Sequence, residues 1–279
     1  MPKLPTRVSR IDPVSAVLSL VAVLAIVLTL QQGPRLGWPI WLFGGLALGM
    51  VGLVVFIWLQ RRAQRHGQDA LVPLKLFRIR NFRWGAISVS TLGFAVYSMN
   101  LPIMLYLQLG AGLSAQMAGL LILPQAIVSV VTAPILGRLT DRLPPGRIST
   151  CGFGAMMASM ALFAILMSTE VPLGWLLIPL VLQGAANAMS WSANSAISMR
   201  GLPADLVGAG SGVYNTARQV GAVIGAAALG AVMQIGLQYT GFSQAMGLSL
   251  VLHVLVLGLG FLAVSRFRPE RDDPAAGNW

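Results

Sequence analysis

Residues 137–147 form the segment Gly-Arg-Leu-Thr-Asp-Arg-Leu-Pro-Pro-Gly-Arg, which is charged, bounded by glycines and flanked by long apolar runs. Glycine and proline in such a segment end helices and favour turns. The segment therefore predicts a short polar hinge between two helices of an apolar bundle. The charges of Asp141 and Arg142 suit helix ends, where the helix dipole stabilises a fitting charge by about 0.3–1 kcal/mol.

The composition identifies a membrane protein. The chain has 279 residues, of which 56% are hydrophobic and 10% charged, and its mean hydropathy is +0.76. A soluble domain carries roughly a quarter charged residues. The formal net charge is +11, but the basic residues lie between apolar runs and not on one face, which argues against a nucleic-acid partner.

Apolar segments long enough to cross a bilayer recur along the chain. A span needs about 20 mostly apolar residues, and eight segments qualify. We therefore predict an all-α membrane protein with about eight transmembrane helices. The predicted spans are 13–30, 40–59, 84–109, 117–136, 148–167, 173–195, 208–235 and 243–264.

The basic residues predict the orientation of these spans. Lys and Arg favour cytoplasmic loops, and all basic residues except Arg35 and Arg218 fall in alternate loops or at the two termini. Both termini are thus expected in the cytoplasm. We expect three parts: a cytoplasmic N-terminus, two helices and a basic amphipathic linker in 1–83, six helices in 84–264, and a cytoplasmic tail in 265–279.

Several motifs together resemble a known transporter family. The hinge is similar to the cytoplasmic G-x-L-x-D-R…G-R loop of the major facilitator superfamily, with two extra residues before its final Gly-Arg. The segments 100–124, containing Leu101-Pro102, Gln108, Gly112-Leu-Ser114 and Leu123-Pro124, and 208–225, Gly-Ala-Gly-Ser-Gly-Val-Tyr-Asn-Thr-Ala-Arg-Gln-Val-Gly-Ala-Val-Ile-Gly, resemble its fourteen-span drug:proton antiporter branch of the EmrB/QacA type.

This resemblance carries expectations about architecture and function. It implies that the first two spans are the extra linker helices of that branch and that the last six form the carboxyl-terminal half, while the amino-terminal six helices are absent. The hinge would act as a gating or conformational loop through Gly137, Asp141, Arg142, Gly146 and Arg147. The implied function is part of a secondary transporter that exports lipophilic or cationic small molecules by proton antiport.

Arg218 is the sharpest single signal inside a predicted span. It lies about ten residues into the span, roughly 15 Å along a helix, and an arginine facing lipid there would cost several kcal/mol. We therefore expect it to face the bundle, with Asn215 three residues earlier on the same side. A structural role and a role in contacting substrate or switching charge both stay open.

Other residues in the spans are candidates for a substrate cavity or for helix packing. Asn187, Trp191 and Asn194 recur at i, i+4 and i+7, on one helical face, and together with Asn100, Gln108 and Gln125 they could line a cavity. Interhelical hydrogen bonding is the alternative role for these polar groups. Gly208, Gly212, Gly221 and Gly225 have the four-residue spacing of close helix packing.

The sequence predicts no cofactor, no metal site and no enzyme activity. There is no phosphate-binding Gly-Lys-Ser/Thr motif and no group of histidines, cysteines or carboxylates at ligand spacing. A membrane enzyme acting on lipid-like substrates and a truncated non-transporting remnant stay as alternatives. The expected partners are membrane lipid, the exported molecule, and either a separate chain supplying the first six helices or a second copy, in a bacterial inner or plasma membrane.

Overall fold

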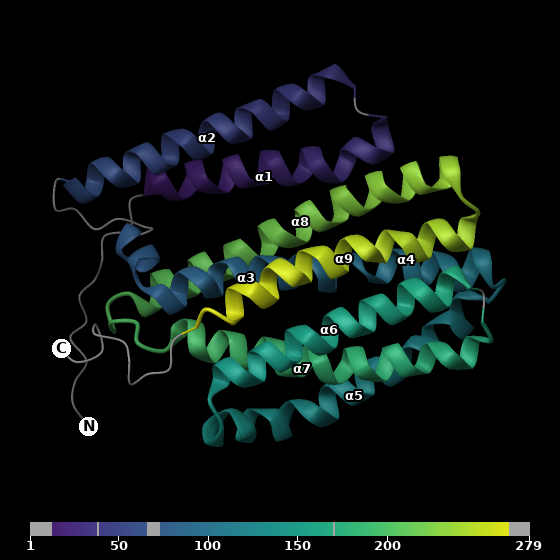
Figure 1. Cartoon of the computed structure of the whole chain (residues 1–279). Helices are drawn as coiled ribbons and strands as arrows, with labels where there is room; N and C mark the ends of the chain where they lie inside the picture. Colours follow the sequence, from purple (N-terminus) through teal and green to yellow (C-terminus); the bar gives the residue numbers. More distant parts are fainter. Residues whose placement is uncertain (1–12, 38, 66–72, 170, 268–279) are drawn as a thin grey trace.

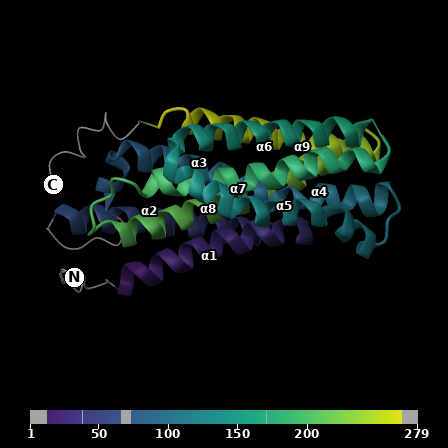
Figure 2. The same cartoon turned by 90° about the horizontal axis from the view of Figure 1, so that it is seen from below.

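The computed structural model describes residues 13–37, 39–65, 73–169 and 171–267, in which every regular element is helical. The helices lie side by side along one common direction (Figures 1 and 2). Short helical segments at Leu74–Arg78, Tyr106–Gly110 and Leu173–Leu176 connect some of them. The main helices are α1 (Pro13–Leu36), α2 (Ile40–Arg65), α3 (Arg80–Ser98), α4 (Asn100–Leu105), α5 (Ala115–Arg142), α6 (Pro145–Ser168), α7 (Leu177–Met199), α8 (Val207–Tyr239) and α9 (Phe242–Val264).

The predicted all-α membrane class is confirmed. Within the described residues, seven helical stretches are long and apolar enough to cross a membrane, and α3 and α4 together make one of them. Helix α1 has a shorter apolar stretch, Val17–Ile26. Its full 24 residues nevertheless extend about 36 Å at 1.5 Å per residue, which makes it the eighth helix of spanning length.

Helix α3 is central to the packing. It contacts α7, α8 and α9, while α6 packs against both α7 and α9 and α5 lies along α7. Fully buried side chains such as Leu92 of α3, Phe153 and Phe163 of α6, Ala186 of α7 and Leu257 of α9 form the core. Helices α1 and α2 form a hairpin that touches this bundle through α1 and α8 (Figure 1).

Several helices extend beyond their predicted spans, and α1 and α5 do so through glycines. Helix α1 continues beyond the predicted end at residue 30, through Gly33-Pro34, and the chain turns at Gly37, whose φ is 68°. Helix α5 continues through Gly137 to Arg142, so only Leu143 and Pro144 lie between α5 and α6. The reason lies in Pro144 and Pro145: a residue before proline avoids the helical region, and Leu143 is extended at φ −110°, ψ 153°.

The third predicted span is not one continuous helix. Helix α3 ends at Ser98, α4 follows from Asn100, and a wider helical turn occupies Tyr106–Gly110. Pro102 lacks the N–H that would bond to the Ser98 carbonyl, which accounts for the interruption. The leucine-proline motif at 101–102 therefore marks a local break within the span.

The motif Gly112-Leu-Ser114 forms the entry to α5. Gly112 has a φ of 70°, a conformation that favours glycine. The Oγ atom of Ser114 accepts a hydrogen bond of 3.3 Å from the backbone N–H of Met117 and so caps α5. Gly112 thus reverses the chain, and Ser114 starts α5.

The helix ends that carry most basic residues gather at one end of the bundle, called here the basic end (Figure 1). The linker segment Leu74–Arg78 packs into this end of the bundle. Its Leu76 is fully buried and forms a small apolar cluster with Phe82 and Leu206. The Nε of Arg80 donates a hydrogen bond of 3.1 Å to the carbonyl of Arg266. The linker and the α7–α8 loop are thus packed together. The described residues do not include three parts of the predicted termini and linker, namely 1–12, 66–72 and 268–279.

Candidate functional site

The intramembrane charge lies at the meeting of α7 and α8. Arg218 is half-buried and follows Val207, the first residue of α8, by eleven residues, or about 16 Å. Its Cζ lies 5.7 Å from the centroid of the Trp191 ring, within cation–π range. The Nε of Arg218 is buried and has no hydrogen-bond partner. Arg218 thus lies against α7, with the Trp191 ring beside its charge.

The backbone beside Arg218 is held by an unusually close approach of α3 and α8. A Cβ on Gly93 would collide with the carbonyl oxygen of Arg218, and a Cβ on Gly221 would collide with the carbonyl oxygen of Ser90. A Cβ on Gly225 would lie 2.6 Å from the carbonyl oxygen of Phe94. Such approach is possible only without side chains. These glycines fix the height and rotation of α8, and so the position of Arg218.

The packing role predicted for the glycines of α8 divides between two faces. Gly221 and Gly225 meet α3, whereas nothing in the described structure lies within 4 Å of a Cβ placed on Gly208 or Gly212. Nine residues separate Gly212 from Gly221 and turn an α-helix by two and a half turns. The two glycines therefore lie on opposite faces, and the prediction of close packing is wrong for Gly208 and Gly212 within this part of the chain.

A hydrogen-bonded network crosses three helices next to Arg218. The Oγ of Ser88 in α3 donates to the Oδ1 of Asn194 in α7 at 2.7 Å, and the Nδ2 of Asn194 donates to the hydroxyl of Tyr214 in α8 at 2.8 Å. The Oγ of Ser198 donates to the carbonyl of Asn194 at 2.5 Å. Asn194 is fully buried. It joins helices and does not reach a cavity, which corrects its expected place in a substrate cavity.

The other predicted cavity residues do not come together. Asn187 and Trp191 are half-buried on α7, Gln108 and Gln125 are half-buried on the segment after α4 and on α5, and Asn100 is exposed on α4. Within α7, the Oδ1 of Asn187 is buried without a hydrogen-bond partner, one turn before Trp191. Asn215 is exposed on α8, and its amide donates to the carbonyl of Ser211 at 3.1 Å. Of these residues, Trp191 contacts Arg218, and Asn215 lies one turn before Arg218 on α8.

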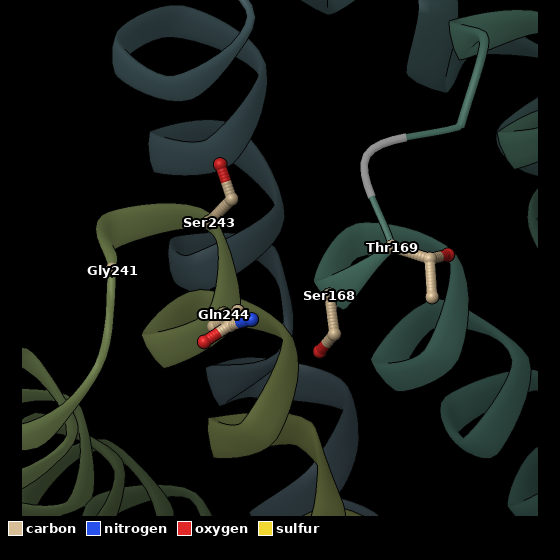
Figure 3. A pocket seen from close by; sticks show the side chains of 5 residues that line it. All are labelled: Ser168, Thr169, Gly241, Ser243 and Gln244. Atoms are coloured by element: carbon tan, nitrogen blue, oxygen red, sulfur yellow. The ribbon is translucent and has the colours of Figure 1, made fainter.

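A hollow is found elsewhere, at the end of the bundle opposite the basic end. Its volume is about 330 Å³. Figure 3 shows hydroxyl and amide side chains from the end of α6 and the start of α9 beside it. The lining residues are Ser168, Thr169, Gly241, Ser243 and Gln244. None of the predicted site residues lines this hollow, and its lining carries no formal charge.

The hinge residues lie where α5 passes into α6. Pro145 is the first residue of α6. A Cβ on Gly146 would contact Ile197 of α7 at 3.3 Å, so the hinge packs on the end of α7. Arg147 is exposed. The side chains of Asp141 and Arg142 lie outside the described part of the structure, and their expected role in gating stays a prediction.

Sequence patterns did not single out Ser88, Ser90, Gly93 or Tyr214. Ser90 links α3 to α8 by donating a hydrogen bond of 3.0 Å to the carbonyl of Ala217. Serine and tyrosine are common in membrane helices, so nothing in their own spacing marks these positions. The available signal was the network itself: a buried Asn194 needs partners, and the neighbouring helices had to provide them.

Comparison with known proteins assigns the family. The model of the Major Facilitator Superfamily matches residues 13–226, which is most of the chain. The chain belongs to the Major Facilitator Superfamily. Transport rather than catalysis is the activity that this family indicates.

Two curated relatives come from Mycobacterium tuberculosis. An uncharacterised MFS-type transporter is 34% identical over 233 residues, which cover 84% of this chain and 40% of the relative. The multidrug resistance protein Stp is 30% identical over 235 residues, which cover 84% of this chain and 43% of Stp. The chain thus spans less than half the length of these relatives.

Proposed function

We propose that this chain forms one lobe and the linker hairpin of a secondary active exporter for lipophilic small molecules, driven by proton antiport. Support comes from the family match over 13–226 and from the multidrug resistance name of Stp. The observation that carries the proposal is the architecture: six spans form one bundle, and the α1–α2 hairpin packs beside it. An extra hairpin of this kind fits the fourteen-span branch of the superfamily.

The transport path would lie between this lobe and a second one. The chain matches less than half of each relative described above, and a single six-helix lobe cannot enclose a path open alternately to two sides. The second lobe would come from further polypeptide or from a second copy of this chain. The cell membrane is the proposed site, with the basic end in the cytoplasm.

Export is tested in bacteria that lack their own multidrug exporters. The chain is produced alone, and also fused to the amino-terminal half of Stp. We expect efflux of the neutral lipophilic dye Nile red from the fusion only, and loss of that efflux when an uncoupler collapses the proton gradient. Efflux from the chain alone would show that a second copy of this chain supplies the second lobe. Efflux that survives the uncoupler would refute proton coupling.

The orientation is tested with reporter fusions at the two ends of the bundle. A fluorescent protein that matures only in the cytoplasm is fused after Gly146, at the basic end, or after Gly112, at the other end. Because basic loops stay in the cytoplasm, we expect fluorescence from the first fusion and none from the second. The reversed pattern would overturn the proposed topology.

The hinge is tested by removing one negative charge. We expect Asp141→Asn to slow efflux by the Stp fusion several-fold while leaving its abundance in the membrane unchanged, because a charge at a helix end that acts in gating changes rates more than folding. Asp205→Asn is the matched control, since Asp205 is exposed in the α7–α8 loop. An equal fall of rate and abundance for Asp141→Asn would leave the hinge a folding role only.

A further inference from the structure

No acidic side chain in the described part of the chain balances the charge of the Arg218 guanidinium. All eight acidic residues of the chain lie outside the interior of the predicted spans. Among the described residues, Arg218 forms no ion pair or side-chain hydrogen bond; its recorded neighbours are the Trp191 ring, 5.7 Å away, and the Tyr214 hydroxyl group. A charge inside a membrane protein is expected to have a partner. The charge of Arg218 has no such partner among the described residues.

The position of Arg218 limits where a partner can come from. The residue lies about 16 Å along α8 from the basic end, and α3 holds this turn of α8 through Gly93 and Gly221. The guanidinium is buried at Nε but the residue is only half-buried. Part of the residue is thus accessible to a molecule that approaches the α7–α8 surface at this depth.

The surroundings suit an amphiphilic molecule more than a bare ion. Trp191 offers an aromatic face directly beside the charge, and the Asn215 and Gln219 amides are exposed one turn before Arg218 and directly after it. Guanidinium and amide N–H groups donate hydrogen bonds, and oxygen anions accept them most strongly. An anionic head with an apolar body fits donors next to an indole ring.

We propose that Arg218 and Trp191 form a binding site for the anionic group of a lipophilic ligand: a carboxylate, sulfonate or phosphate oxygen pairs with the guanidinium while the apolar part packs against the indole. This inference rests on the proposed export function and narrows its substrate class. A cationic ligand at the same place meets a like charge at low dielectric, which disfavours it. The lobe described here thus selects for anionic and against cationic amphiphiles.

The test measures binding to the purified 279-residue chain in phosphatidylcholine nanodiscs. Three fluorescent probes share one body: 11-(dansylamino)undecanoate, its neutral primary amide, and the corresponding undecylammonium. We expect the carboxylate to bind at least about tenfold more tightly than the amide, in line with a charge-assisted hydrogen bond, and the ammonium more weakly than the amide. Equal binding of all three probes to the wild-type protein overturns the site.

Two substitutions locate the effect. Arg218→Gln should bring the carboxylate down to the affinity of the amide, whereas Arg218→Lys should keep most of the preference and guards against a folding defect of the first variant. The matched control is Arg266→Gln, because Arg266 also lies over a tryptophan, 5.0 Å from the Trp84 ring, but at the basic end. A preference lost equally in Arg266→Gln would show a general surface charge effect and refute the site.

The lipid composition of the nanodiscs distinguishes a lipid headgroup from a free amphiphile as the natural anion. Nanodiscs containing phosphatidylglycerol supply an anionic headgroup, and competition with the carboxylate probe in the wild type but not in Arg218→Gln would identify lipid as the natural ligand. Binding that is unchanged by phosphatidylglycerol would identify a free amphiphile. Either result supports the anion site. Because binding is measured without transport, failure of this site and failure of the export proposal give different results: the first abolishes the probe preference, and the second abolishes efflux.

Discussion

Gly221→Ala is expected to lower the free energy of unfolding by about 3 kcal/mol or more, at the upper end of the range for overpacking. The added Cβ would collide with the backbone carbonyl of Ser90. A side chain could rotate away, but a backbone oxygen of α3 can move only with its helix. Displacing α3 would also break the bond from the Ser90 hydroxyl to the carbonyl of Ala217 and disturb the contact of Gly93 with Arg218.

Gly212→Ala is the matched control for this prediction. It makes the same change in the same helix, yet nothing lies within 4 Å of the added methyl group, so the change in stability should stay within about 0.5 kcal/mol. Thermal unfolding of both variants in detergent, followed by the loss of the monodisperse peak after heating, gives the comparison. Equal midpoints for the two variants would show that α3 and α8 do not approach each other this closely.

The sequence predicted well the features that a single helix determines, namely the position of each helix and of the hinge. Hydropathy located the helices because a span must satisfy its own backbone in lipid, and the two prolines at 144–145 predicted the hinge. Helix ends were less accurate, since polar residues such as Arg138 continue a helix beyond the membrane until proline stops it. The end of α5 at Arg142 is set by that proline and not by the hydropathy of the segment.

What depends on two helices was harder to predict. The four-residue glycine spacing is the same for Gly208 and Gly212 as for Gly221 and Gly225, and only the neighbour α3 distinguishes the pairs. Likewise, Asn187 and Asn194 share one face of α7. Among the described residues the Oδ1 of Asn187 has no hydrogen-bond partner, whereas Asn194 bonds to Ser88 and Tyr214. Periodicity reports which residues share a face. It does not report what that face meets.

Asn194→Leu is expected to cost about 1–3 kcal/mol of unfolding free energy. Interhelical hydrogen bonds in membrane proteins contribute about 0.6 kcal/mol on average and up to about 1.7. Leucine removes two of them, to Ser88 and to Tyr214, and leaves the buried hydroxyl of Tyr214 without its donor. Detergent melting curves give the measurement, and Tyr214→Phe should reproduce part of the loss.

Asn187→Leu should leave the free energy of unfolding unchanged or raise it. The contrast with Asn194→Leu tests whether Asn194 joins the three helices. The Oδ1 of Asn187 is buried with no hydrogen-bond partner, so an apolar side chain of similar size removes an unsatisfied group and is expected to be neutral or stabilising. The two residues lie seven positions apart on one face of α7, and general effects of leucine on that helix apply to both. If Asn187→Leu destabilised the chain as much as Asn194→Leu, polarity along the whole face of α7 would be needed for folding, and the assignment of Asn194 as the residue that joins α3, α7 and α8 would be wrong.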